Sequence, residues 1–271
     1  MKPEYICIGL PKAGTSWLYN VLKRHNDVYV PPVKEISYFS NKGFLYKKNI
    51  WAFFFHKDWY NVKKREYFKQ FINSIKPYRN KNLSRKDQIW ILKYCFLPQN
   101  DFWYRKLFSE SKTKISIDIS PVYSFLDEEE IESISKRFPK TSIILILRDP
   151  VERAWSHFKM DYLIGTNNKS ESFSEDEIKA YYNRQPDNNK LISKWLKHYS
   201  SDRFKILQYE ELQHNPESFY KSVCNIMQIN PDGINRAYHD VINTISNKGH
   251  KLDIPDNHKR ILIDIYGKNK E

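Results

Sequence analysis

Residues 11–16 combine the side chains and the spacing that anion binding needs. An apolar run gives way to Pro-Lys-Ala-Gly-Thr-Ser, and apolar residues then return at helical spacing. This pattern predicts a buried strand, a tight turn at Gly14 and a helix from about Thr15. The first N–H groups of a helix have no partner within it and attract anions. Lys12 and Ser16 add further donors, so the segment predicts a phosphate-binding loop.

The place of the lysine separates this loop from that of nucleotide-hydrolysing enzymes. In G-x-x-x-x-G-K-[ST] the lysine follows the second glycine, and the next hydroxyl residue binds magnesium. Gly9 and Gly14 have this separation, but Thr15 stands where that lysine would be, and Lys12 lies inside the loop. Many proteins have a strand, a glycine turn and a helix with a lysine nearby. From this loop alone, an ordinary structural turn without a bound anion is therefore an alternative.

A second expected strand-to-helix junction carries another anion-binding side chain. The apolar run 143–147 ends at Arg148, and a helix is expected from Val151. An arginine at the carboxyl end of a buried parallel strand faces the crevice in which open α/β sheets bind ligands. Its guanidinium can hold a phosphate at two points, and the Ser156 hydroxyl, two helical turns on, could reach the same anion. The alternative is a simple ion pair between Arg148 and a neighbouring carboxylate such as Glu152.

Together the two motifs resemble those of sulfotransferases that use 3′-phosphoadenosine 5′-phosphosulfate (PAPS). Pro-Lys-x-Gly-Thr-[ST] resembles the family's 5′-phosphosulfate loop, and R-[DN]-P-x-x-R-x-x-S resembles its 3′-phosphate signature. The second motif is matched by Arg148, Asp149, Pro150, Arg153 and Ser156. Both motifs occur in the family's order, and weaker similarities extend the resemblance to about Tyr266.

The resemblance implies a role for each matching residue. Lys12 would be catalytic, donating to the bridging oxygen of PAPS as the 5′-phosphate leaves. No metal is expected, because lysine and arginine side chains would neutralise the donor. The residues assigned to PAPS are Lys12, Ala13, Gly14, Thr15, Ser16 and Trp17 for the 5′-phosphate end and Arg148, Ser156, Lys248 and Gly249 for the 3′-phosphate.

The resemblance also implies a base. Residues 34–39 are similar to a Lys-Glu-x-x-x-Phe segment of carbohydrate-type and related bacterial members, in which the glutamate removes the acceptor proton. Glu35 is therefore the expected base. An ordinary ion pair between Glu35 and Lys34 is the alternative, and His56 and Asp118 are the reserve bases.

Composition and charge are compatible with one basic catalytic domain spanning 1–271. A chain of this length can bury about three quarters of its unfolded surface. Lys and Arg number 45 against 32 Asp and Glu, and the net charge of +13 attracts anions. Nucleic acid is the generic partner of such a charge, but a doubly phosphorylated donor and an acidic acceptor explain it equally well.

Cysteine usage and hydropathy bear on the cellular compartment. Three cysteines without paired spacing imply no disulfide framework. The first expected strand begins almost at Met1, which leaves no room for a secretory signal, and no apolar run approaches the ~20 residues that cross a bilayer. We expect a cytoplasmic protein with no membrane partner, more similar to bacterial sulfotransferases than to the membrane-anchored animal carbohydrate enzymes.

Alternating strand and helix patterns predict a three-layer α/β fold, with a central parallel sheet flanked by helices and a P-loop-like phosphate loop. An aromatic and basic insertion at about 42–113 is expected to form a helical subdomain, with a nucleic-acid stacking surface as the alternative. The polar stretch 165–189 is expected to be a mobile loop or lid. Strands are expected at 4–10, 28–30, 114–118, 142–147 and 204–209, and helices at 15–25, 127–138, 151–163 and 216–227.

These observations favour a sulfotransferase that moves the sulfuryl group of PAPS to a hydroxyl or amine by in-line displacement. Carbohydrates are the first candidate acceptors, and other small metabolites also fit. Two alternatives come from other classes. A small-molecule kinase is disfavoured by Thr15 and by the motif at Arg148, and a nucleic-acid-binding module is disfavoured because no binding motif occurs in the insertion.

Overall fold

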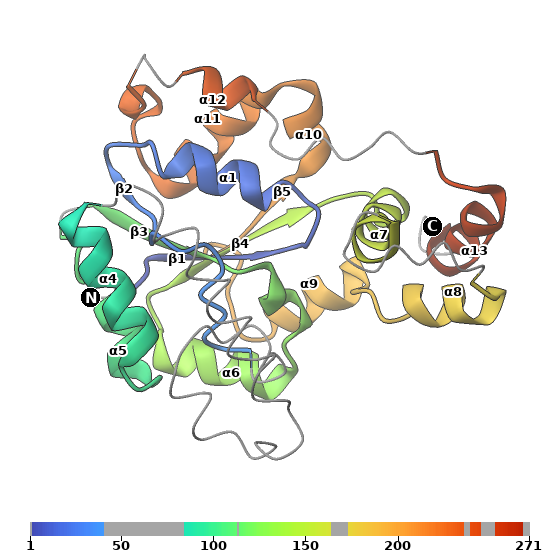
Figure 1. The fold of residues 1–271 in the computed structure, drawn as a ribbon, viewed down its shortest axis with the longest axis horizontal. Coiled ribbons are helices and arrows are strands. Elements are labelled where there is room, and N and C mark those ends of the chain that lie inside the picture. The colour runs from blue at the N-terminus through green and yellow to red at the C-terminus, as the bar shows by residue number, and fades with distance from the viewer. Residues whose placement is uncertain are drawn as a thin grey trace.

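Five parallel strands form the central sheet of the computed structural model, which describes residues 2–40, 84–112, 114–163, 173–235, 239–244 and 253–267. The strand order is β2-β3-β1-β4-β5, and every neighbouring pair is parallel. The central strand is therefore β1, between β3 and β4 (Figure 1). The strands are β1 Tyr5–Gly9, β2 Val28–Tyr29, β3 Ile115–Ile119, β4 Ser142–Leu147 and β5 Phe204–Gln208.

Helices cover both faces of this sheet. In Figure 1, α1, α11 and α12 lie above the sheet and α6 and α9 below it. This arrangement confirms the predicted three-layer α/β fold with its P-loop-like loop after β1. The helices are α1 Thr15–Leu22, α4 Arg85–Phe96, α5 Asp101–Leu107, α6 Glu128–Arg137, α7 Pro150–Phe158, α8 Glu175–Tyr182, α9 Asn188–Leu196, α10 Tyr209–His214, α11 Pro216–Met227, α12 Asp240–Asn243 and α13 Asp256–Tyr266.

The central strands are apolar because both of their faces are covered. Ile6, Cys7 and Ile8 of β1 and the residues Ile143–Ile146 of β4 are almost completely inaccessible. Continuous apolar runs of this kind are typical of parallel strands with helices on both sides. The main core therefore lies directly behind the two strand ends that carry the predicted anion-binding motifs.

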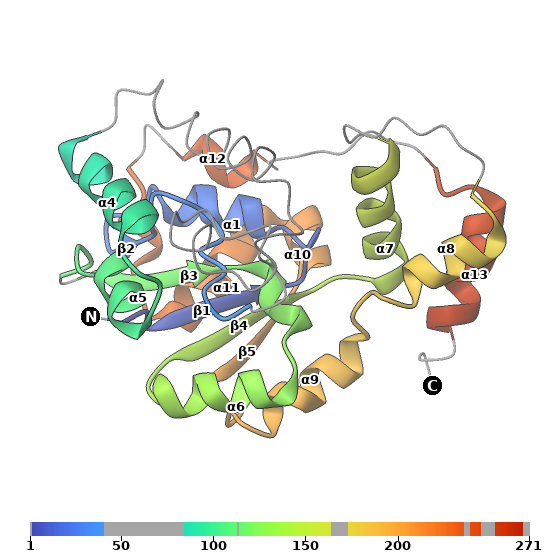
Figure 2. The ribbon, with the colours of Figure 1, turned by 60° about the horizontal axis from the view of Figure 1, so that its bottom comes forward.

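A second aromatic cluster supports α7, the helix after β4. Figure 2 shows α7, α8 and α13 grouped beside the sheet. Phe158 of α7 packs edge-on against Tyr181 of α8 and His258 of α13. The hydroxyl of Tyr182 lies 2.7 Å from Nδ1 of the buried His258. The C-terminal helix thus fixes the helix that carries Ser156.

Two of the expected elements need correction. The stretch 165–189 is not a loop throughout, because α8 occupies 175–182 and α9 begins at Asn188. A capping box between Ser174 and Glu177 starts α8, and Ile178 turns into the core, an amphipathic pattern that the polar composition concealed. The helix expected at 151–163 is α-helical only to Phe158 and continues as a π-helix through Lys159–Leu163.

The described part of the insertion is helical. Within residues 84–112, α4 and α5 place Trp90, Tyr94, Trp103 and Tyr104 in the main core. The rest of the expected insertion, residues 42–83 and residue 113, lies outside the described residues. Across the described ranges, no helix combines the length and apolar character needed to cross a membrane.

Gly9, the last residue of β1, lies close to Pro121 in the segment after β3, and a substitution at Gly9 tests this close approach. Its φ is +111°, and a Cβ there would lie 3.0 Å from the Cα of Pro121. We expect Gly9→Ala to lower the free energy of unfolding by about 1–3 kcal/mol, measured by urea denaturation.

Gly267→Ala is the matched control. Gly267 has φ −69°, and its added Cβ would meet only the side chain of Ile263 at 3.3 Å. Its unfolding free energy should stay within about 1 kcal/mol of the wild type. Equal effects of the two substitutions would contradict the claim that Gly9 is constrained by the close approach of Pro121.

Candidate functional site

A cavity of about 660 Å³ opens at the carboxyl edge of the sheet. We call it the sheet-edge cavity. Its lining comes from the segments that follow all five strands, the position at which open α/β sheets bind ligands. The residues that line it are Pro11, Lys12, Gly14, Thr15, Ser16, Trp17, Lys34, Glu35, Ser40, Pro121, Val122, Phe125, Leu126, Arg148, Ser156, His157, Met160, Asp161 and Tyr209.

The loop after β1 has the conformation of an anion cradle. Lys12 and Gly14 adopt positive φ values of 64° and 81°, and α1 begins at Thr15 without a side-chain cap. The N–H groups at the start of α1 therefore remain available to an anion in the cavity. A Cβ on Gly14 would lie 2.7 Å from Leu212, so glycine also allows α10 to pack closely behind the loop.

The ammonium group of Lys12 lines the cavity and has only a weak hydrogen-bond acceptor among the described residues. Its one hydrogen-bond contact among the described residues is to Sδ of Met160, at 3.8 Å. A thioether is a weak acceptor, so this contact leaves the ammonium available to a ligand. Burial and, to a lesser extent, the nearby guanidinium of Arg148 lower the pKa of Lys12. An anion in the cavity would oppose this lowering, because an opposite charge nearby favours the protonated ammonium.

Arg148 joins the second motif to the first. Its Nη1 donates to the backbone carbonyl of Lys12 at 2.8 Å, and its guanidinium lies over the Tyr209 ring, 4.6 Å from the centroid. The contact to Glu152 is longer, at 3.7 Å, and that carboxylate is largely exposed, so the simple ion pair is the weaker interaction. The buried Nε has no hydrogen-bond partner among the described residues and remains a donor for an anion.

Other residues of the second motif have different surroundings. Ser156 lines the cavity, as expected. Asp149 accepts hydrogen bonds from the backbone N–H groups of Val151 and Glu152 and so caps α7. Arg153 is buried away from the cavity and donates to the carbonyl of Pro186 at 2.7 Å. It therefore connects α7 to the segment before α9.

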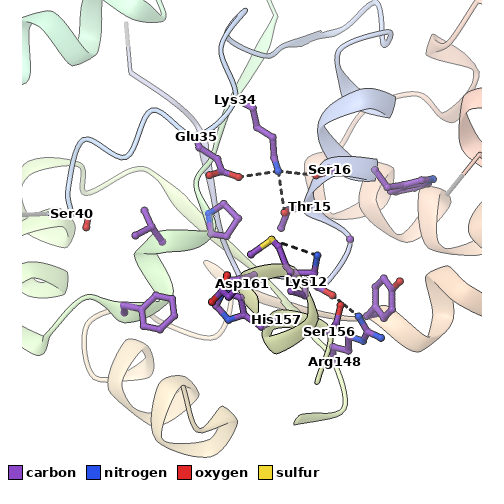
Figure 3. Close-up of a pocket in the computed structure, with 18 of the residues that line it drawn as sticks. Lys12, Thr15, Ser16, Lys34, Glu35, Ser40, Arg148, Ser156, His157 and Asp161 are labelled. Carbon is purple, nitrogen blue, oxygen red and sulfur yellow. Dashed lines mark hydrogen bonds and ion pairs between the residues drawn. The ribbon is translucent and has the colours of Figure 1, made fainter. Parts of the chain in front are cut away.

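Glu35 and Lys34 lie on the opposite side of the cavity from Arg148, as Figure 3 shows. Lys34 Nζ is 3.0 Å from Glu35 Oε1, 3.0 Å from Ser16 Oγ and 3.4 Å from Thr15 Oγ1. Glu35 has φ 64°, and its backbone N–H donates to the carbonyl of Ile119 at 3.2 Å. The ion pair considered for Glu35 is thus present, and its lysine also contacts the phosphate loop.

Asp118 is not placed to meet an acceptor, which corrects its assignment as a reserve base. It is 1% exposed, is not part of the cavity wall, and accepts hydrogen bonds from the hydroxyls of Ser120, Tyr104 and Tyr123. Two of these hydroxyls in turn hold the segment after Glu35. The N–H of Ser37 donates to Ser120 Oγ, and the N–H of Tyr38 donates to Tyr123 Oη.

Three of the expected site residues, His56, Lys248 and Gly249, lie outside the described residues.

Ala13, another expected residue, is buried within the loop after β1, and its N–H donates to the Leu10 carbonyl. The described residues contain no group of three or more metal-ligating side chains.

The structure adds His157 and Asp161 to the cavity wall, which the sequence analysis missed. His157 Nδ1 lies 2.9 Å from Gln185 Oε1, and its Nε2 lies 3.8 Å from Asp161 Oδ2. Tyr181 donates to the same carboxylate at 2.8 Å. The spacing of four residues along one helix was a signal that these side chains share a face.

Comparisons with known proteins identify a family for this chain and a fold that it shares with solved structures. The model of the Sulfotransferase family matches residues 3–232. The fold is similar to that of a sulfotransferase from Alicyclobacillus acidocaldarius, with TM-score 0.64 and 17% identity over 99% of this chain and 93% of that one. The sulfotransferase domain of the Synechococcus PCC 7002 olefin synthase gives TM-score 0.54 and 16% identity over 97% and 94%. No curated protein matches the sequence.

The pH dependence of stability tests the burial of Asp118. Burial raises its pKa from 3.8 to about 6, although the three hydroxyl donors oppose this shift. Between these values the folded protein retains a proton that the unfolded chain has released. The wild type should therefore lose up to about 3 kcal/mol of stability, relative to Asp118→Asn, as the pH rises from about 4 to about 6, with no further change above.

Urea denaturation of both proteins across this range is the measurement. A difference in unfolding free energy that does not vary with pH would show that Asp118 titrates normally in the folded protein.

Proposed function

The chain belongs to the sulfotransferase family, and from this premise we propose that it moves the sulfuryl group of PAPS to a hydroxyl or amine of a small acceptor. The family and the fold support sulfuryl transfer. The observation that carries the choice of donor is the meeting of two anion-binding motifs in one cavity, joined by the hydrogen bond from Arg148 to the Lys12 carbonyl.

The cavity offers complementary groups for both phosphates of such a donor. At one end are the N–H groups at the start of α1 and the hydroxyls of Thr15 and Ser16. At the other are Ser156 and the unpartnered Nε of Arg148. A nucleotide with a single 5′-phosphate would leave the second set unused, which supports a 3′,5′-bisphosphorylated nucleotide. We propose that Lys248 and Gly249 complete the 3′-phosphate site.

The reaction would proceed by in-line displacement at sulfur. An acceptor oxygen or nitrogen forms a bond to sulfur while the bond from sulfur to the bridging oxygen breaks, and the electron pair of that bond remains on the leaving 5′-phosphate. Lys12 would donate to the bridging oxygen, because its ammonium lies in the loop that holds the 5′-phosphate. Preorganised donors of this kind typically contribute roughly 10²–10³ in rate.

The acceptor would lie on the side of the cavity that holds Glu35. This carboxylate is 41% exposed and would take the acceptor proton. Val122 and Phe125 add apolar surface to the lining of the same cavity, which suits a small metabolite or the apolar face of a sugar ring. His157 is a second candidate base, because it lines the same cavity.

The cytoplasmic location stays a prediction.

The donor can be tested by calorimetry with adenosine 3′,5′-bisphosphate and AMP. We expect the wild type to bind the bisphosphate more tightly by about 10-fold or more, because Arg148 and Ser156 have a partner only in that ligand. Arg148→Ala should remove most of this preference and weaken AMP binding by a smaller factor, because the substitution also removes the hydrogen bond to the Lys12 carbonyl in the 5′-phosphate loop. Equal affinities of the wild type for both nucleotides would exclude the proposed 3′-phosphate site.

The base can be identified by comparing Glu35→Gln with His157→Gln in turnover of radiolabelled PAPS over a panel of hydroxyl and amine acceptors. Glu35→Gln keeps the side-chain shape and removes the proton acceptor. Transfer to a hydroxyl should therefore fall by roughly 10²–10⁴ while bisphosphate affinity persists. A larger loss in His157→Gln, with near-normal turnover in Glu35→Gln, would assign the base to His157.

A further inference from the structure

The ammonium of Lys34 has three oxygen partners at the sheet-edge cavity, through two hydrogen bonds and one ion pair. An ammonium has three donors and no acceptor. The three acceptors within reach are Ser16 Oγ at 3.0 Å, Glu35 Oε1 at 3.0 Å and Thr15 Oγ1 at 3.4 Å (Figure 3). The side chain is 23% exposed, so these contacts are partly shielded from water. Lys34 therefore bridges the start of α1 and the residue proposed as base.

This contact determines what the two loop hydroxyls can do. A hydroxyl has one donor and two acceptor lone pairs. Because Lys34 can only donate, the oxygens of Thr15 and Ser16 must act as acceptors toward it, and each O–H proton must point elsewhere. Both side chains line the cavity. Their protons are then available to an anion beside the N–H groups at the start of α1.

We propose that Lys34 is a positioning residue for the 5′-phosphate of the donor, because it accepts no hydrogen bond and so directs the hydroxyl protons of Thr15 and Ser16 toward the anion. The proposal rests on the proposed function of the cavity and adds to it a residue and a role. The ammonium also contributes positive charge at the 5′-phosphate end, at the opposite side of the loop from Lys12.

The same ammonium connects donor binding with the acceptor side. Its ion pair holds the carboxylate of Glu35 at the cavity wall. The backbone of Glu35 has φ 64°, a conformation that is unfavourable for residues other than glycine. An isolated, partly exposed ion pair between neighbouring residues would contribute little and would have no effect on nucleotide binding. Lys34 also contacts two hydroxyls of the phosphate loop, those of Thr15 and Ser16. These contacts favour a role in nucleotide binding over a simple surface ion pair with Glu35.

Two nucleotides that differ only in the 5′-phosphate test the proposal. Calorimetry would compare adenosine 3′,5′-bisphosphate with adenosine 3′-monophosphate in the wild type and in Lys34→Met, which keeps the length of the side chain and removes its donors. We expect bisphosphate affinity to fall by about 10- to 100-fold, the effect of losing charge-assisted hydrogen bonds. Affinity for the 3′-monophosphate should change by less than about twofold.

A double-mutant cycle with Ser16→Ala tests whether Lys34 acts through the hydroxyl. If it does, part of the loss is shared, and the double variant should bind the bisphosphate more tightly than the product of the two single effects predicts. Lys34→Arg, which retains charge and donors, should recover part of the affinity. Lys221→Met is the matched control, because it removes an exposed lysine of α11 outside the cavity wall and should bind both nucleotides as the wild type does.

The possible results are distinguishable. Unchanged bisphosphate affinity in Lys34→Met, equal losses for both nucleotides, or strictly multiplicative effects with Ser16→Ala would each overturn the role of Lys34 while leaving the donor assignment in place. Absence of bisphosphate binding by the wild type would instead reject the proposed function, and the role of Lys34 would be rejected with it.

Discussion

The hydrogen bond from Arg148 to the carbonyl of Lys12 is the contact on which the site depends. It exists because β1 and β4 are parallel neighbours, so that the loops after both strands emerge at the same edge of the sheet. A guanidinium fixed by a backbone carbonyl and by the Tyr209 ring loses little freedom when it binds an anion. The same bond satisfies the carbonyl oxygen of Lys12 with a donor from the second motif.

Concentrating cations in one cavity has an electrostatic cost that a ligand can offset. Lys12 is partly buried, which lowers its pKa, and the charges of Arg148, Lys159 and Lys34 lower it further, whereas the carboxylate of Asp161 acts in the opposite direction. Binding of a polyanion would stabilise the folded state as well as fill the site, because anything that binds only the folded protein shifts the folding equilibrium. The net charge of +13 would also attract such a ligand from a distance.

The segment that carries Glu35 is held in a different way, by hydroxyls bonded to a buried carboxylate. Asp118 is enclosed by three hydroxyls, and two of these, from Ser120 and Tyr123, receive the backbone N–H groups of Ser37 and Tyr38. The network fixes a segment in which both Glu35 and Ser37 have positive φ. The three hydroxyls offset part of the cost of burying the Asp118 carboxylate, and the same enclosure keeps it out of the cavity wall.

Local sequence signals such as apolar runs, glycine turns and the cap Asp149 are sufficient to predict the parallel sheet and to locate the two motifs at the ends of β1 and β4. The strand expected at 142–147 and the helix at 216–227 have the observed bounds. Which side chains contact one another depends on how the elements pack. Lys34 reaches Ser16 and Asp118 is enclosed by Tyr104 because distant segments converge at one sheet edge, and no local pattern encodes such contacts. Residue spacing along a chain specifies secondary structure, whereas burial and hydrogen-bond partners depend on how the elements pack.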